Sequence, residues 1–83
     1  MTTLYFYTKN GCPLCDKGLM ILKDLQKKYN FEIQERDIYT SDEWLETYQI
    51  RIPVIEDAEG IVLDEGIISN LQLEQILNKM FTC

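Results

Sequence analysis

The stretch LYFYTKNGCPLC, residues 4–15, joins an aromatic strand to the start of a helix through a turn that carries two cysteines. Residues 4–8 are rich in aromatic side chains, which is typical of a buried strand. Asn10-Gly11 interrupts this pattern. Pro13 suits a first helical turn, because its φ is already helical and its missing N–H would be unpaired there. The sequence therefore places Cys12 at the N-cap of a helix that begins at Pro13.

Downstream of this turn, the apolar residues follow helical spacing to about residue 29: Leu14, Ile21, Leu22, Leu25 and Tyr29. Residues 31–34 alternate apolar and polar side chains, which predicts a half-exposed edge strand. Thr40 and Glu43 have the spacing of a capping box and predict a short helix that runs through Tyr48.

The second half of the chain predicts a hairpin followed by a helix. Residues 52–55 and 61–63 are apolar strands, and the turn between them ends in a glycine. Ser69 and Gln72 have the spacing of a second capping box. The helix they open runs to about residue 80, and its apolar face consists of Leu73, Ile76, Leu77 and Met80.

The order of these elements is β-α-β-α-β-β-α, which predicts an α/β fold with a four-stranded mixed sheet covered by helices. The first two strands are joined through a helix and should be parallel. The chain has 83 residues and no linker or repeat, so we expect a single domain over residues 1–83.

Composition excludes several kinds of site. The chain has no histidine, which removes Cys–His and Ser–His catalysis and the commonest zinc ligand. Its net charge of −6 argues against nucleic acid as a partner.

Neither a signal peptide nor an apolar run of membrane-spanning length is apparent, so we expect a cytoplasmic protein with no membrane contact. Most of its lysines fall within the first 30 residues, where they either attract an acidic partner or form an ordinary solvated helix face.

Cys12 and Cys15 are the candidate catalytic residues. A bridge between them would close a very short loop, so the pair is a poor structural staple. In a reducing compartment such a pair is more often redox-active or metal-binding. The N–H groups at the helix N-terminus, together with Lys9, favour the thiolate of Cys12. Cys15 lies one turn into the helix and should be more sheltered, which suits attack by Cys12 and resolution by Cys15.

Three other interpretations of the cysteine pair stay open. A zinc site needs four ligands, and one chain with three cysteines and no histidine supplies too few unless two chains share the ion. The pair could also be an inert disulfide, or two buried cysteines that pack as small apolar residues. We assign no metal ligands. Asp16 is either a first-turn acid or a proton relay, and Cys83 either an exposed thiol or a bridging partner.

Residues 4–15 together with Ile52-Pro53 resemble the glutaredoxins of the thioredoxin-fold superfamily. The motifs C-P-L-C-D at 12–16 and R-I-P-V-I at 51–55 are most similar to small bacterial glutaredoxin-like proteins. The resemblance implies a thiol–disulfide oxidoreductase with a cis peptide bond before Pro53, beside the cysteines. It implies that the backbone of Ile52 pairs with an extended substrate strand. The residues it assigns to substrate binding are Lys9, Pro13, Leu14, Ile52 and Pro53.

The resemblance leaves the electron source open. Glutathione-binding glutaredoxins carry a Gly-Gly pair followed by acidic residues, whereas here Gly66 stands alone before two isoleucines. Lys9 matches a lysine associated with the glutathione carboxylate. The donor is therefore either glutathione, as a co-substrate, or a thioredoxin-reductase-like flavoprotein. We expect a monomer with no metal or organic cofactor that acts on a disulfide-containing protein or a small thiol substrate. The alternative is a non-catalytic binding module with the same fold.

Overall fold

The computed structural model describes residues 2–82. Its elements follow the predicted order, with a short 3-10 helix inserted before the second α-helix. They are β1 (Thr2–Thr8), α1 (Pro13–Gln26), β2 (Phe31–Asp37), η1 (Ile38–Thr40), α2 (Asp42–Tyr48), β3 (Val54–Glu56), β4 (Val62–Glu65) and α3 (Asn70–Thr82).

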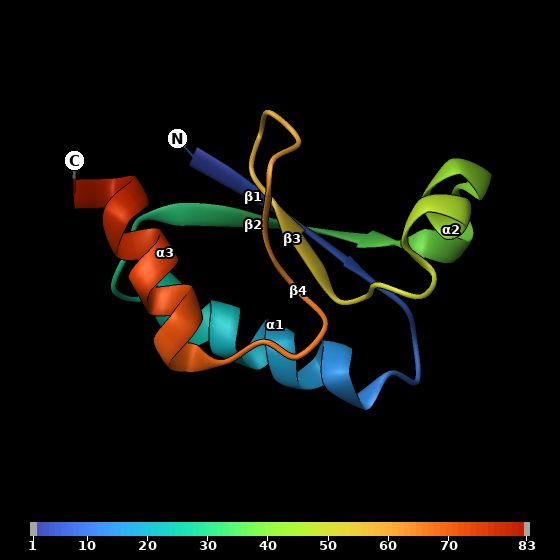
Figure 1. Cartoon of the computed structure of the whole chain (residues 1–83), viewed down its shortest axis with the longest axis horizontal. Coiled ribbons are helices and arrows are strands. Elements are labelled where there is room, and N and C mark those ends of the chain that lie inside the picture. The colour runs from blue at the N-terminus through green and yellow to red at the C-terminus, as the bar shows by residue number, and fades with distance from the viewer. Residues whose placement is uncertain (1, 83) are drawn as a thin grey trace.

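The four strands form one mixed sheet in the order β2-β1-β3-β4. β1 and β2 are parallel, and β2 is an edge strand, as the sequence predicted. β3 is antiparallel to both β1 and β4, and the hairpin between β3 and β4 contains a bulge. In Figure 1, α1 and α3 lie together along one face of the sheet, and α2 lies at the end remote from the two termini.

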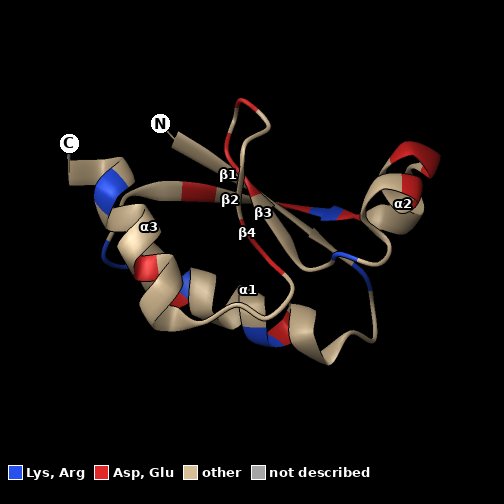
Figure 2. Ribbon diagram, in the orientation of Figure 1, with Lys and Arg blue, Asp and Glu red and all other residues tan. Residues whose placement is uncertain are grey.

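Each face of the sheet has its own apolar core, because successive strand residues point to opposite faces. Leu4 and Phe6 of β1 pack with α1 and α3 in the larger core. Tyr7 and Val54 pack with α2 in the smaller one. Figure 2 shows acidic residues and no basic ones along α2.

The capping box predicted at Thr40 and Glu43 is wrong. The N-cap of α2 is Ser41, whose Oγ accepts the N–H of Trp44 at 3.3 Å. Asp37 opens η1 by accepting the N–H of Tyr39, and the Thr40 hydroxyl donates back to the Asp37 carbonyl at 2.6 Å. Thr40 therefore closes η1 and does not open α2.

Other boundaries differ by a few residues. β2 extends three residues beyond its predicted end to Asp37, and β3 begins at Val54, after the Ile-Pro pair. Leu14, which fits the apolar pattern of α1, is 47% exposed and lies outside the core. The Ser69 cap is confirmed, because its Oγ accepts the N–H of Gln72 at 3.2 Å. None of the helices within residues 2–82 has the length and apolar character needed to cross a membrane.

Candidate active site

The turn between β1 and α1 places Cys12 at a helix N-terminus. Gly11 has a φ of +73°, a left-handed conformation that a glycine adopts without strain. Cys12 is extended, with φ −110° and ψ 103°, and Pro13 follows in the first helical turn. The Cys12 Sγ accepts the N–H of Cys15 at 3.2 Å. The N-cap position predicted for Cys12 is therefore confirmed.

Cys12 and Cys15 are joined by a disulfide, and their Cα atoms are 5.2 Å apart. Cys15 is 1% exposed and Cys12 is 9% exposed, so Cys15 is the more sheltered of the two, as expected. Cys12 is nevertheless more covered than its N-cap position suggested. Gly11, Pro13 and Leu14 around it are all exposed, which places its sulfur just beneath the surface of this turn.

The second part of the site is a cis peptide bond between Ile52 and Pro53, which the family resemblance implied. Helix α1 lies directly against this proline at Gly18. A Cβ atom added at Gly18 would lie 3.3 Å from Pro53 Cγ and 3.0 Å from Ile68 Cδ1. The sequence analysis missed this close contact at Gly18. A glycine inside a helix costs about 1 kcal/mol relative to alanine, so its presence there indicates that a neighbour packs too closely for a side chain.

Two backbone hydrogen bonds hold the cis-proline loop. The N–H of Gly66 donates to the Pro53 carbonyl at 2.8 Å, and Gly66 has a positive φ of 73°. The N–H of Ile52 donates to the Tyr48 carbonyl at 3.1 Å. The N–H of Ile52, one of the backbone groups expected to pair with a substrate strand, is therefore bonded within the chain.

A family model described as a glutaredoxin-like domain matches residues 3–80. The chain belongs to this glutaredoxin-like family. Among solved structures, it is similar to a protein from Nitrosomonas europaea, with a TM-score of 0.80, 24% identity and coverage of 98% of this chain and 92% of that one. No curated protein gives a significant match.

Two further solved structures are similar to this glutaredoxin-like chain. One is a structural-genomics target protein from X. campestris, with a TM-score of 0.78, 22% identity and coverage of 92% of this chain and 96% of that one. The other is the oxidised thioredoxin from Plasmodium falciparum, with a TM-score of 0.69, 16% identity and coverage of 98% and 82%. At these identities the likeness shows the fold, which is thioredoxin-like.

An ion pair braces the cis-proline loop of the glutaredoxin-like domain against β4. Arg51 donates from Nε and Nη2 to the two carboxylate oxygens of Glu65, at 3.1 and 3.2 Å. This hydrogen bonding holds the pKa of Glu65 below its usual value. Arg51 precedes Ile52, and Glu65 precedes Gly66. The ion pair therefore ties the segment before the cis peptide bond to the part of β4 next to the Gly66 that bonds Pro53.

Tyr48 lies behind the same loop, at the end of α2. Its ring stacks on that of Tyr7 with the centroids 4.1 Å apart, and its hydroxyl donates to Glu56 Oε2 at 2.6 Å. Burial raises the pKa of Tyr48, and hydrogen bonds with Glu56 and Tyr7 raise it further. Tyr48 thus holds the Ile52 N–H through its carbonyl and a buried acid through its hydroxyl.

The remaining candidate residues of the glutaredoxin-like domain lie around the turn. Lys9 is half-buried in the loop before Cys12, and Asp16 is exposed in the first turn of α1. Neither forms an ion pair with another residue in the range 2–82. Within that range, no cluster of three or more cysteine or acidic side chains is placed to hold a metal ion. Cys83 lies outside the described residues.

Proposed function

We propose that the chain is a dithiol thiol–disulfide oxidoreductase that works in the cytoplasm through Cys12 and Cys15. The observation that carries this proposal is the cysteine pair itself. It is closed into a disulfide at the start of a helix that packs on cis-Pro53 through Gly18. A short disulfide contributes little as a staple, and the helix N-terminus supplies the donors that a thiolate needs.

The proposed exchange has two steps. In the reduced protein, the Cys12 thiolate attacks one sulfur of a substrate disulfide, and the other sulfur leaves as a thiolate that takes a proton from solvent. Cys15 then loses its proton and attacks Cys12 Sγ, which forms the Cys12–Cys15 bond and releases the second substrate thiolate. The substrate gains two electrons, and an external two-electron donor must reduce the protein again.

The substrate we propose is a disulfide in an extended polypeptide segment. The Ile52 carbonyl would accept one backbone hydrogen bond from that segment. Leu14 is 47% exposed beside Cys12, and Ile67, which follows the Gly66 bonded to Pro53, is 79% exposed. These apolar side chains are suited to apolar residues that flank a disulfide.

The test is to trap the intermediate. In a Cys83→Ser background, Cys15→Ser should accumulate mixed disulfides at Cys12, and Cys12→Ser should accumulate none while losing insulin-disulfide reduction. The background removes adducts formed through Cys83, the third cysteine. A Cys12→Ser protein that still reduces disulfides would end the proposal, as would a Cys15→Ser protein that forms no adducts.

For the electron donor, we propose a flavoprotein reductase in preference to glutathione. Gly66 uses its N–H to hold Pro53, and the residue after it is the apolar Ile67. No second glycine or acidic side chain stands there to bind the charged ends of glutathione. NADPH oxidation should therefore depend on the chain in a thioredoxin-reductase assay. Equal or faster turnover in a glutathione and glutathione-reductase assay would contradict this choice.

A further inference from the structure

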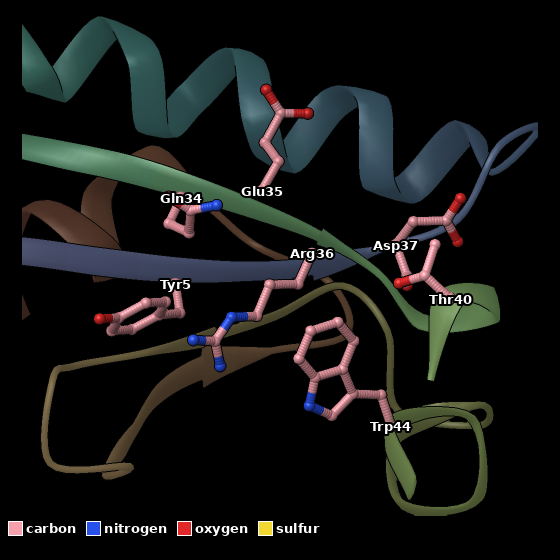
Figure 3. Close-up of a pocket in the computed structure, with 7 residues that line it drawn as sticks. All are labelled: Tyr5, Gln34, Glu35, Arg36, Asp37, Thr40 and Trp44. Carbon is pink, nitrogen blue, oxygen red and sulfur yellow. The ribbon is translucent and has the colours of Figure 1, made fainter. Parts of the chain in front are cut away.

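The guanidinium of Arg36 is held by aromatic rings on the sheet face opposite α1 and α3. Its Cζ lies 4.1 Å from the ring centroid of Tyr5, 5.1 Å from that of Trp44 and 5.5 Å from that of Tyr7. Nη1 donates to the Tyr7 hydroxyl at 2.6 Å. Figure 3 shows the guanidinium between the rings of Tyr5 and Trp44. Its position is therefore fixed before any ligand arrives.

No contacting acid neutralises the charge of Arg36. The other arginine, Arg51, is paired through two hydrogen bonds with Glu65. By contrast, no carboxylate within residues 2–82 lies at ion-pair distance from Arg36. Asp37 accepts the N–H of Tyr39 at 2.9 Å, and Figure 3 shows the Glu35 carboxylate on the other side of β2.

The edges of this guanidinium are suited to an oxyanion. Three aromatic rings surround the guanidinium, and one of its five N–H donors is bonded to Tyr7. The remaining donors lie in the guanidinium plane, in the fork that binds a carboxylate through two parallel hydrogen bonds. A cavity of about 640 Å³ lies beside Arg36, and its lining also includes Gln34 and Thr40.

We propose that this cavity binds a small carboxylate through Arg36, at a site separate from Cys12 and Cys15. Asp37 belongs to its lining, and the chain has a net charge of −6. These negative charges repel a dianion more than a monoanion, which favours a carboxylate over a phosphate. The aromatic walls favour a carboxylate that is attached to a ring or to another apolar group.

Benzoate, acetate and inorganic phosphate, titrated at constant ionic strength, test the proposal. The readouts are the NMR signals of the Trp44 indole N–H and the Arg36 Nε–H, and the indole signal is unambiguous because the chain has one tryptophan. Benzoate should shift both signals saturably, with a dissociation constant of about 1 mM. Acetate should bind more weakly, and phosphate more weakly still. No saturable shift, or phosphate binding as tight as benzoate binding, would overturn the proposal.

Variants locate the site. Arg36→Gln should abolish the shift. Arg36→Lys keeps the positive charge but loses the planar fork of donors, so it should weaken the binding of benzoate by at least about tenfold. Lys23→Gln removes the same charge from an exposed position on α1, on the other face of the sheet, and should change the affinity by less than about twofold, because salt screens distant charges. Cys12→Ser should bind as the wild type does, which separates this site from the redox proposal. If the folded Arg36→Lys protein bound benzoate with wild-type affinity, binding through the two parallel hydrogen bonds of the guanidinium would be ruled out.

Discussion

Tyr48 offers a test at the scale of one hydroxyl group. Tyr48→Phe removes the donor to Glu56, a carboxylate that is only 7% exposed, and should lower the free energy of unfolding by about 1–3 kcal/mol at pH 7. Urea denaturation of the oxidised protein measures the loss. Tyr39→Phe is the matched control, because the Tyr39 residue is 64% exposed and so its hydroxyl is not held in a buried hydrogen bond. An equal effect of both changes would contradict the role of Tyr48.

The same hydroxyl should give the protein an alkaline limit. The folded-state pKa of Tyr48 is raised above its usual value, so the folded chain keeps a proton that the unfolded chain loses. Its contribution to stability is complete below about pH 10, the usual tyrosine pKa, and is lost as the pH rises above it. Tyr48→Phe should therefore reduce the decline in stability above that pH.

Asp64 should act at the acid end of the pH range. Its Oδ1 accepts the N–H of Glu65, whereas its Oδ2 is buried with no hydrogen-bond partner among the described residues. Burial raises the pKa of Asp64, so the folded chain binds a proton more tightly than the unfolded chain does. This stabilisation is complete below about pH 3.9, the usual aspartate pKa, and is lost as the pH rises through the folded-state value.

The measurement is the difference in unfolding free energy between the wild type and Asp64→Asn, taken at several pH values. This difference should move in favour of Asp64→Asn as the pH rises above about 3.9, the usual aspartate pKa. Glu59→Gln, at an exposed acid of the β3–β4 turn, should give a smaller change. A difference for Asp64→Asn that does not vary with pH would show that the carboxyl is solvated.

At the scale of elements, the contact between α1 and the cis-proline loop depends on Gly18. Gly18→Val would force methyl groups against Pro53 and Ile68, where even a Cβ atom comes within 3.3 and 3.0 Å. We expect a loss of about 1–3 kcal/mol in the free energy of unfolding, measured in urea. Lys17→Val, at the exposed neighbouring position, should lose about 0.5 kcal/mol through helix propensity alone, whereas Gly18→Val improves helix propensity and so can lose stability only through the clash. Equal losses would contradict the close packing.

The sequence predicted the elements that depend on local pattern. The strand–turn–helix at residues 4–15 and the Ser69 cap follow from spacing and backbone preference, so they could be predicted. The cap of α2 could not be predicted, because η1 precedes α2 in the chain and the Thr40 hydroxyl bonds to the Asp37 carbonyl there. The Gly66 N–H on Pro53 and the packing at Gly18 join segments far apart in the sequence. Such contacts leave no periodic signal.

At the scale of the whole molecule, the sheet separates two sites. The disulfide lies at the start of α1, on the face where Leu4 and Phe6 pack under α1 and α3. Arg36 lies on the opposite face with the ring of Tyr5. Since the two sites share no residue, a change at one can be tested while the other serves as an internal control.

The stability of the whole chain should depend only modestly on the disulfide. The bridge from Cys12 to Cys15 spans a sequence separation of 3, so it removes little conformational entropy from the unfolded chain. For so short a loop, the expected stabilisation is about 2 kcal/mol, whereas a bridge across a long loop would give about 4–5 kcal/mol. Urea denaturation of the oxidised protein and of the protein in excess dithiothreitol measures this difference. A protein that unfolds on reduction would show that the pair is a structural staple, and such a pair could not cycle between its two states.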